Sequence, residues 1–165
     1  MRSPDFGRWL LLAAGVIAAD FASKQWILSA FAPHESVEVL PFFNLVLVFN
    51  SGAAFSFLAQ AGGWQKWFFV ALALVISAWI AVMLRRHADD ALQSAALAFV
   101  MGGALGNVID RLRFGAVVDF LDVHIAGWHW PAFNLADSAI TVGVALLVLH
   151  AFIHKESHHE RPGQA

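Results

Sequence analysis

The chain has 165 residues, of which 59% are hydrophobic and 13% are charged, and its formal net charge is −2 at pH 7. Soluble domains carry about 25% charged residues, so we expect lipid to be the main solvent of this chain. The small net charge of mixed sign excludes a nucleic-acid-binding surface. The absence of cysteine excludes disulfides, thiolate metal sites and a cysteine nucleophile.

Four apolar segments are long enough to cross a bilayer, because a hydrocarbon core of about 30 Å requires roughly 20 apolar residues in a helix. We expect helices over residues 9–31, 64–84, 91–112 and 134–153. The outer loops, residues 32–63 and 113–133, are longer than helix pairs need. The sequence therefore predicts one polytopic domain over residues 1–165, an all-α bundle of four transmembrane helices with functional outer loops.

The first expected helix contains Asp20 and Lys24, four residues apart on one face. Ionisable residues inside a span are costly and by default mark a functional site. Alternatively, the two side chains pair with each other and hold the bundle together. A cleavable signal peptide is a third interpretation, since Ala30-Phe31-Ala32 fits the cleavage pattern. The apolar run is too long for an ordinary signal sequence and both charges interrupt it, so we favour an uncleaved helix.

The first outer loop contains a strand-like segment and a polar turn. FFNLVLVFN, from Phe42 to Asn50, is rich in β-branched and aromatic residues and follows Pro41, which indicates a strand. It runs into FNSGAAFS, where Asn50, Ser51 and Gly52 are typical of a turn. The functional alternative is that Asn50 and nearby backbone groups, with Gly52 as a candidate, hold an extended peptide.

The third expected helix ends in GGALGNVIDRLR, whose small residues permit close packing against another helix. Asn107, Asp110 and Arg111 stand at i, i+3 and i+4, so they share one helical face. Asp110 and Arg111 could simply be charges at the membrane interface. That interpretation gives no reason for Asn107, about one turn deeper.

The second outer loop contains VVDFLDVHI, from Val117 to Ile125, which alternates in part and indicates another strand. Gly127 is placed to turn the chain into WHWPAF. The strand-like segments of the two outer loops could form a small sheet that rests on the outer surface of the bundle.

The fourth expected helix opens with Asn134 as a plausible N-cap, which puts Asp137 at the third helical position in a capping-box-like arrangement. A carboxylate is favourable in a first turn, but this does not explain Asp119 in the strand-like segment. If that strand folds over the mouth of the bundle, Asp119 meets Asp137. Two carboxylates in contact share a proton, and such a pair can hydrolyse a peptide bond by general acid–base catalysis. We assign the shared proton to Asp119, because the helix N-terminus favours ionised Asp137.

The distribution of cations predicts the orientation in the membrane. An even number of spans places both termini on one side. Six cations lie in the N-terminus, the loop between the second and third helices and the tail, whereas three border the outer loops. The positive-inside rule therefore places both termini in the cytoplasm, although Arg111 and Arg113 oppose this orientation.

Other functions have weaker support in the sequence. It contains no zinc-peptidase H-E-x-x-H, no G-x-S-x-G and no phosphate-binding fingerprint. The histidines near the C-terminus are expected to be solvated rather than metal ligands: His150, His154, His158 and His159. A small ion or proton carrier is the main alternative, with a relay made of Asp20, Lys24, Asp110 and Arg111. A structural assembly factor is a third, and would not depend on carboxylates.

Five motifs together resemble the bacterial lipoprotein signal peptidase (signal peptidase II) family. They are DFASK, FNSGAAFS, GNVIDR, VVDF and FNLADSAI, which appear in the family's order and spacing between Asp20 and Ile140. The resemblance implies a four-helix aspartic peptidase with an extracytoplasmic β-cradle. It would cleave a prolipoprotein before a cysteine that carries a diacylglyceryl group.

The resemblance also assigns residues and partners. It makes Asp119 and Asp137 catalytic. The supporting residues that it implies are Asp20, Lys24, Asn50, Asn107, Asp110, Arg111 and Asn134. It implies no metal or organic cofactor, and globomycin is the family's characteristic inhibitor. The expected location is the bacterial cytoplasmic (inner) membrane, with membrane lipid around a monomer and the active site near the extracytoplasmic face.

Overall fold

A computed structural model describes residues 4–52 and 62–159 of the chain. Within these residues it forms four helices, namely α1 (Pro4–Ala30), α2 (Trp64–Arg86), α3 (Ala91–Phe114) and α4 (Leu135–His159). Each helix has a stretch that is long and apolar enough to cross a membrane, so the four predicted spans are confirmed. α1 begins earlier and α4 ends later than the apolar segments predict, because both helices continue into polar sequence.

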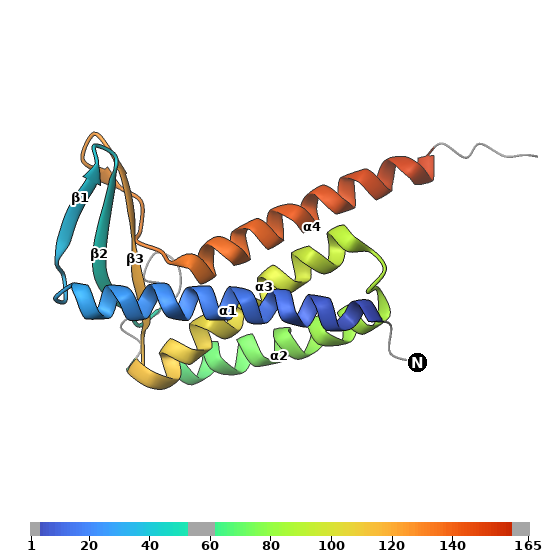
Figure 1. Cartoon of the computed structure of the whole chain (residues 1–165), viewed down its shortest axis with the longest axis horizontal. Helices are drawn as coiled ribbons and strands as arrows, with labels where there is room; N and C mark the ends of the chain where they lie inside the picture. The colour runs from blue at the N-terminus through green and yellow to red at the C-terminus, as the bar shows by residue number, and fades with distance from the viewer. Residues whose placement is uncertain (1–3, 53–61, 160–165) are drawn as a thin grey trace, which may run out of the picture.

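α3 is the central helix of the bundle and packs against each of the other three (Figure 1). In its most apolar stretch 56% of the residues are buried, against 17% to 22% in the other three helices. Small residues allow this close packing. A Cβ atom on Gly102 would lie 2.7 Å from Val16 Cβ of α1, and one on Gly103 would collide with the backbone oxygen of Ala136 in α4. The prediction of close helix contact at GGALG is confirmed.

The outer loops form a four-stranded antiparallel sheet at one end of the bundle, in the order β1-β2-β3-β4. β2 (Phe43–Asn50) and β3 (Val117–Ile125) are the two predicted strands, and Ala126 and Gly127 form the turn into β4 (Trp128–His129). β1 (Ser36–Leu40) was not predicted. Its sequence, SVEVL, alternates in part, but it is short and all of its residues are exposed, so its pairing with β2 holds it in place.

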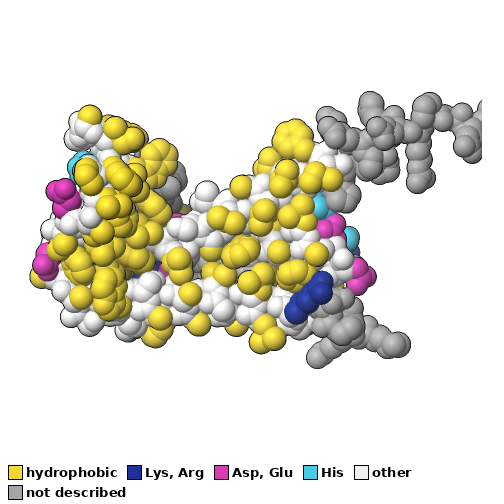
Figure 2. Space-filling view, turned by 45° about the horizontal axis from the view of Figure 1, so that its top comes forward, with side chains coloured by type: hydrophobic (Ala, Val, Ile, Leu, Met, Phe, Trp, Pro, Cys, Tyr) yellow, Lys and Arg dark blue, Asp and Glu magenta, His cyan; other side chains and the backbone are white. Residues whose placement is uncertain are grey.

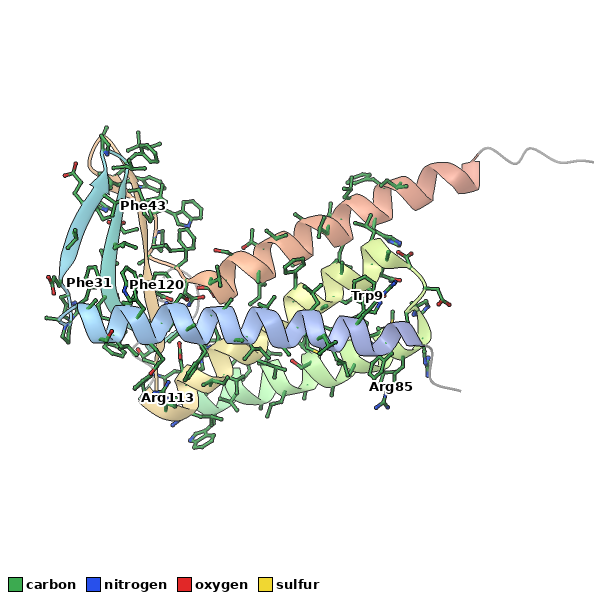
Figure 3. The ribbon with its side chains drawn as sticks, viewed as in Figure 1. Trp9, Phe31, Phe43, Arg85, Arg113 and Phe120 are labelled. Atoms are coloured by element: carbon green, nitrogen blue, oxygen red, sulfur yellow. The ribbon has the colours of Figure 1, made fainter. Side chains whose placement is uncertain are left out.

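A small apolar cluster joins the sheet to the bundle. Ile27 at the end of α1 packs with Leu47, Val118 and Phe120 from β2 and β3, and Phe31 lies against them. Figure 3 shows Phe31 and Phe120 at this junction. The start of α1 and the end of α4 lie at the opposite end of the bundle (Figure 1). The sheet is therefore anchored at the end remote from both described chain ends.

The sheet is amphipathic. Its register places Glu38, Asn44 and Asp122 side by side across three strands. The next row is apolar and consists of Val37, Leu45 and Leu121. Because neighbouring residues of a strand point to opposite faces, the sheet is polar on one face and apolar on the other at these two rows. Acidic side chains lie on the side of the sheet that is turned away from the helices (Figure 2).

At the other end of the bundle, His150 is part-buried and contacts a carboxylate. Its Nε2 lies 2.6 Å from Oδ2 of Asp90, the residue that caps α3. The pair therefore joins α4 to the α2–α3 loop. The side chains of His154, His158 and His159 lie outside the described residues.

Candidate active site

Lys24 forms the centre of a buried ionic cluster that connects four elements. Its Nζ lies 2.7 Å from Oδ2 of Asp20 and 2.8 Å from Oδ2 of Asp110. All three side chains are about 99% buried. Asp20 accepts the backbone N–H of Ala136 at 2.9 Å, and Asp110 accepts that of Val118 at 3.1 Å. The cluster thus fixes the start of α4 and of β3 against α1 and α3. Asp20 and Lys24 do pair, and Asp110 is not an interfacial charge.

Asn107 connects this cluster to Asp137. Its Oδ1 accepts hydrogen bonds from Lys24 Nζ at 3.0 Å and from Asn134 Nδ2 at 3.2 Å. Because both of these donors lie on the Oδ1 side of the amide, Asn107 Nδ2 faces the other way. This nitrogen donates to Asp137 Oδ1 at 2.8 Å. The deep position of Asn107, unexplained by an interfacial role, is explained by this contact.

Asn134 links the two candidate catalytic carboxylates. Its Oδ1 accepts the backbone N–H of Asp137 at 2.8 Å, so it caps α4 as predicted. Its Nδ2 donates to Asp119 Oδ1 at 2.8 Å. The Asp137 carboxylate faces Asn107 rather than the cap, so the arrangement differs from a capping box. One side chain therefore positions both the start of α4 and the carboxylate of β3.

Asn50 supplies a second donor to Asp119, from its Nδ2 to Oδ2 at 3.1 Å. Its Oδ1 accepts the backbone N–H of Gly52 at 3.0 Å, which is the predicted turn. Arg111 Nη2 donates to the carbonyl oxygen of Gly52 at 3.0 Å and holds this turn against α3. The rest of the FNSGAAFS motif, residues 53–56, lies outside the described residues.

Asp119 and Asp137 line one cavity of about 790 Å³, which is also lined by Asn50, Asn107 and Arg111. Asp119 is 2% exposed. Burial raises the pKa of Asp119 to about 7, the negative charge of Asp137 adds to this, and the hydrogen bonds from Asn50 and Asn134 lower it in part. A carboxyl group with this pKa is protonated in about half of the molecules at pH 7. Asp20, Lys24 and Asp110 lie behind this cavity and not in its wall.

The sequence did not indicate one whole wall of the cavity, the segment from Trp130 to Phe133. The sequence feature that could have indicated this wall is the run WHWPAF immediately before Asn134. This stretch is aromatic and contains a proline, and its pattern is typical of neither a strand nor a helix. On the α4 side the cavity reaches Val142, which is 47% exposed. It therefore extends to a surface where the helix faces lipid. The described residues contain no group of three His, Asp or Glu side chains placed to hold a metal ion.

Four membrane-crossing helices and two carboxylates in one cavity, one of them protonated near neutral pH, define an acid–base hydrolase of the membrane. Residues 12–153 match the family described as signal peptidase (SPase) II. The chain therefore belongs to the signal peptidase II family, and it is a multi-pass membrane peptidase of the aspartic class.

Individual relatives agree with this assignment. The chain is similar to a lipoprotein signal peptidase of Paraburkholderia phymatum, with 57% identity over 140 residues that cover 85% of this chain and 84% of the relative. It is 53% identical to one of Azoarcus sp. (strain BH72), over 93% and 90% of the two chains. A solved bacterial membrane enzyme shares the fold with a TM-score of 0.82 at 31% identity, over 96% of this chain and 94% of that one.

Proposed function

We propose that Asp119 and Asp137 are the catalytic pair of a peptidase that removes the signal peptide of prolipoproteins before a diacylglyceryl-modified cysteine. The observation that carries this proposal is the cavity that both carboxylates line. Its mixture of apolar walls and a few converging polar groups is typical of a ligand site.

We infer a different role for each carboxylate from its contacts. Asp119, with its pKa raised to about 7, carries the proton and donates it towards the carbonyl oxygen of the scissile bond. Asp137 lies in the first turn of α4, where the helix N-terminus and Asn107 stabilise its negative charge, and it accepts a proton from the attacking water. The water oxygen bonds to the carbonyl carbon and gives a tetrahedral intermediate with two hydroxyl groups. The C–N bond then breaks, the leaving amine takes the proton held by Asp137, and one of the two hydroxyl groups returns its proton to Asp119 as the new carboxyl group forms. The other residues position the pair: Asp20, Lys24, Asn50, Gly52, Asn107, Asp110, Arg111 and Asn134.

The same fold supports a proposed orientation. The active site and the sheet lie at one end of the bundle, whereas the described chain ends and Arg85 lie at the other (Figure 3). Six cations belong to the chain termini and the α2–α3 loop, whereas three, including Arg111 and Arg113, border the sheet end. The positive-inside rule therefore places the end with more cations in the cytoplasm, and we propose that the cavity opens near the extracytoplasmic face of the cytoplasmic membrane. The apolar face of the sheet would then rest on lipid, with exposed Ile125 and Trp128 at the interface.

The cavity also supports a proposed binding mode for the substrate and for an inhibitor. A peptide segment would bind near Asp119, with the acyl chains leaving beside Val142 along the lipid-facing side of α4. Globomycin, a cyclic peptide, would occupy the same volume and compete with the substrate. We further propose that the protein acts as a monomer and forms a single domain over residues 1–165, in which α3 packs against the other three helices.

The ion-carrier alternative is not favoured. Its relay residues Asp20, Lys24 and Asp110 neutralise one another beside the cavity. The far end of the bundle is instead filled by an apolar cluster that includes Trp9, Ile80, Leu84 and Met101. A proton path would have to cross this cluster.

The test uses purified protein in detergent with a synthetic diacylglyceryl-modified prolipoprotein peptide, in the presence of EDTA. We expect wild type to cleave before the modified cysteine, and Asp119→Asn and Asp137→Asn to lose at least about 10³-fold in rate while remaining folded. Asp89→Asn, an exposed carboxylate at the far end of the bundle, is the matched control and keeps full activity. Cleavage by either dyad variant at the wild-type rate would remove that residue from the mechanism.

A further inference from the structure

Asp122 is the carboxylate of the second outer loop that the proposed mechanism does not use. It is buried on β3, three residues after Asp119, and because side chains alternate along a strand it points to the opposite face of the sheet. It does not line the catalytic cavity. A buried carboxylate outside the site needs partners, and its partners identify what it holds.

Asp122 connects β4 to β2 across β3. His129 Nδ1 lies 2.9 Å from both carboxylate oxygens of Asp122, and Asn44 Nδ2 donates to Oδ2 at 2.8 Å. The carboxylate only accepts, so Nδ1 carries the proton in this contact. Burial acts to raise the pKa of Asp122, but the hydrogen bonds from His129 and Asn44 outweigh it and lower the pKa below its usual value. The ring of His129 also stacks on His124, with centroids 4.8 Å apart.

The β3–β4 hairpin needs such a contact because β4 is only two residues long and both residues are exposed. Its two-residue turn has positive φ at Ala126 and at Gly127, the geometry of a tight hairpin. A hairpin this short is marginally stable by itself. The interaction of Asp122 with His129 therefore fixes the end of a segment that backbone pairing alone holds weakly.

The hairpin leads directly into the cavity wall from Trp130 to Phe133. The N–H of Trp130 donates to the carbonyl oxygen of Val123 at 2.8 Å, and Phe133 pairs with Leu121 through its N–H at 3.0 Å. The wall is thus attached to β3 at both ends. Asp122 and His129 act at the Trp130 end, where the strand is shortest.

We propose that Asp122 and His129 are positioning residues for substrate binding, because together they hold the β3–β4 hairpin and so the Trp130–Phe133 wall in place. This inference rests on the proposed peptidase function. Among the described residues, the side-chain hydrogen bonds of Asp122 and His129 do not reach Asp119 or Asp137. Substitution of Asp122 or His129 should therefore weaken substrate binding far more than the chemical step. The expected signature is an increased KM with little change in kcat.

The first test compares two substitutions at one position. His129→Ala removes the donor, and we expect KM for the lipopeptide to rise on the order of tenfold, the size of one hydrogen bond to a charged group. His129→Asn retains a side-chain N–H near the position of Nδ1, and its KM should stay within about twofold of wild type. Equal KM values for the two variants would overturn the proposal.

The second test replaces the Asp122–His129 contact with a covalent one. His124 and His129 are directly paired across the hairpin, one step from the turn-closing pair of Ile125 and Trp128. Such a pair does not exchange backbone hydrogen bonds, and its Cα atoms come close enough for a disulfide. The chain has no cysteine of its own, so His124→Cys/His129→Cys forms one defined bond.

We expect the oxidised double variant to have a KM close to wild type and the reduced one to have a KM about tenfold higher, with similar kcat. The reductant should leave wild type unchanged. The oxidised double variant should also tolerate Asp122→Ala, since the disulfide replaces the lost contact. This inference would be overturned if the double variant had a wild-type KM in both redox states, or if it lost kcat alone. The proposed peptidase function would still stand in that case, provided that wild type cleaves the lipopeptide and Asp119→Asn does not. An inactive wild type would instead overturn the proposed function.

Discussion

The amide of Asn134 donates to Asp119 at 2.8 Å while its oxygen accepts the backbone N–H of Asp137, so one side chain sets the positions of both candidate catalytic residues. Helix capping and active-site assembly therefore depend on the same amide. Substitutions that retain one function and remove the other can separate them.

We predict that Asn134→Ser remains folded but loses most of its activity. Serine is a good N-cap, so α4 should retain its start, whereas the hydroxyl is too short to replace the donor to Asp119. We expect kcat to fall on the order of 10²-fold, as for the loss of one preorganised donor. Asn134→Ala should lose the same activity and a further ~1 kcal/mol of stability, measured by thermal unfolding in detergent. Full activity of Asn134→Ser would contradict the role of the amide.

The raised pKa of Asp119 predicts how activity depends on pH. The mechanism needs Asp119 protonated, so kcat/KM should fall as the pH rises through about 7, the pKa of this group in the free enzyme. Cleavage of the lipopeptide between pH 5 and pH 9 measures this limb, and Asp89→Asn should follow the same curve as wild type. An activity that increases from pH 7 to pH 9 would show that the proton is not on Asp119.

The raised pKa of Asp119 also predicts how the stability of the fold depends on pH. Because the folded state binds the proton of Asp119 more tightly than the unfolded state does, its contribution to stability is complete below pH 3.8 and is lost as the pH rises to about 7. Asp119→Asn cannot ionise. We therefore expect this variant to gain thermal stability relative to wild type between pH 5 and pH 8. A difference in Tm that does not change over this range would count against the buried position of this carboxylate.

Removing the buried cation should destabilise the fold. Lys24→Met leaves Asp20 and Asp110 facing each other without the ammonium, which costs about 3–5 kcal/mol for a broken buried pair. Lys66→Met is the matched control, because Lys66 lies against the exposed ring of Trp67 and should cost less than about 1 kcal/mol. Thermal unfolding in detergent measures both. Equal stability of the two variants would mean that Lys24 is not the centre of the cluster.

Two glycines test the contact between α3 and α4. Gly103→Ala would force its Cβ into the backbone oxygen of Ala136, next to Asp137, and should cost about 1–3 kcal/mol together with activity. Gly15→Ala has open space around the new methyl group and should be neutral or slightly stabilising, since alanine favours a helix. Unfolding temperatures and kcat separate the two. A fully active Gly103→Ala would show that α4 can shift without disturbing the dyad.

The sequence alone determined the number of spans and the chemistry of the site. Lipid requires about 20 apolar residues in every crossing helix, so the four helices are visible without any tertiary information. The same solvent makes polar residues inside a span rare, which is why Asp20, Lys24 and Asn107 stand out. Alternation and flanking turn residues identified β2 and β3, and the spacing of Asn134 and Asp137 identified a helix cap.

Only the tertiary structure decided which of these residues meet. Asn50, Asn107 and Asn134 come from β2, α3 and the start of α4, and no local pattern requires them to converge on Asp119 and Asp137. β1 escaped notice although SVEVL alternates in part, because the segment is short and fully exposed and is held in place by its pairing with β2. The wall from Trp130 to Phe133 and its connection to Asp122 likewise depend on long-range contacts. Local sequence specifies solvent preference and helix ends, whereas the partners of a buried polar group are chosen by packing between distant elements.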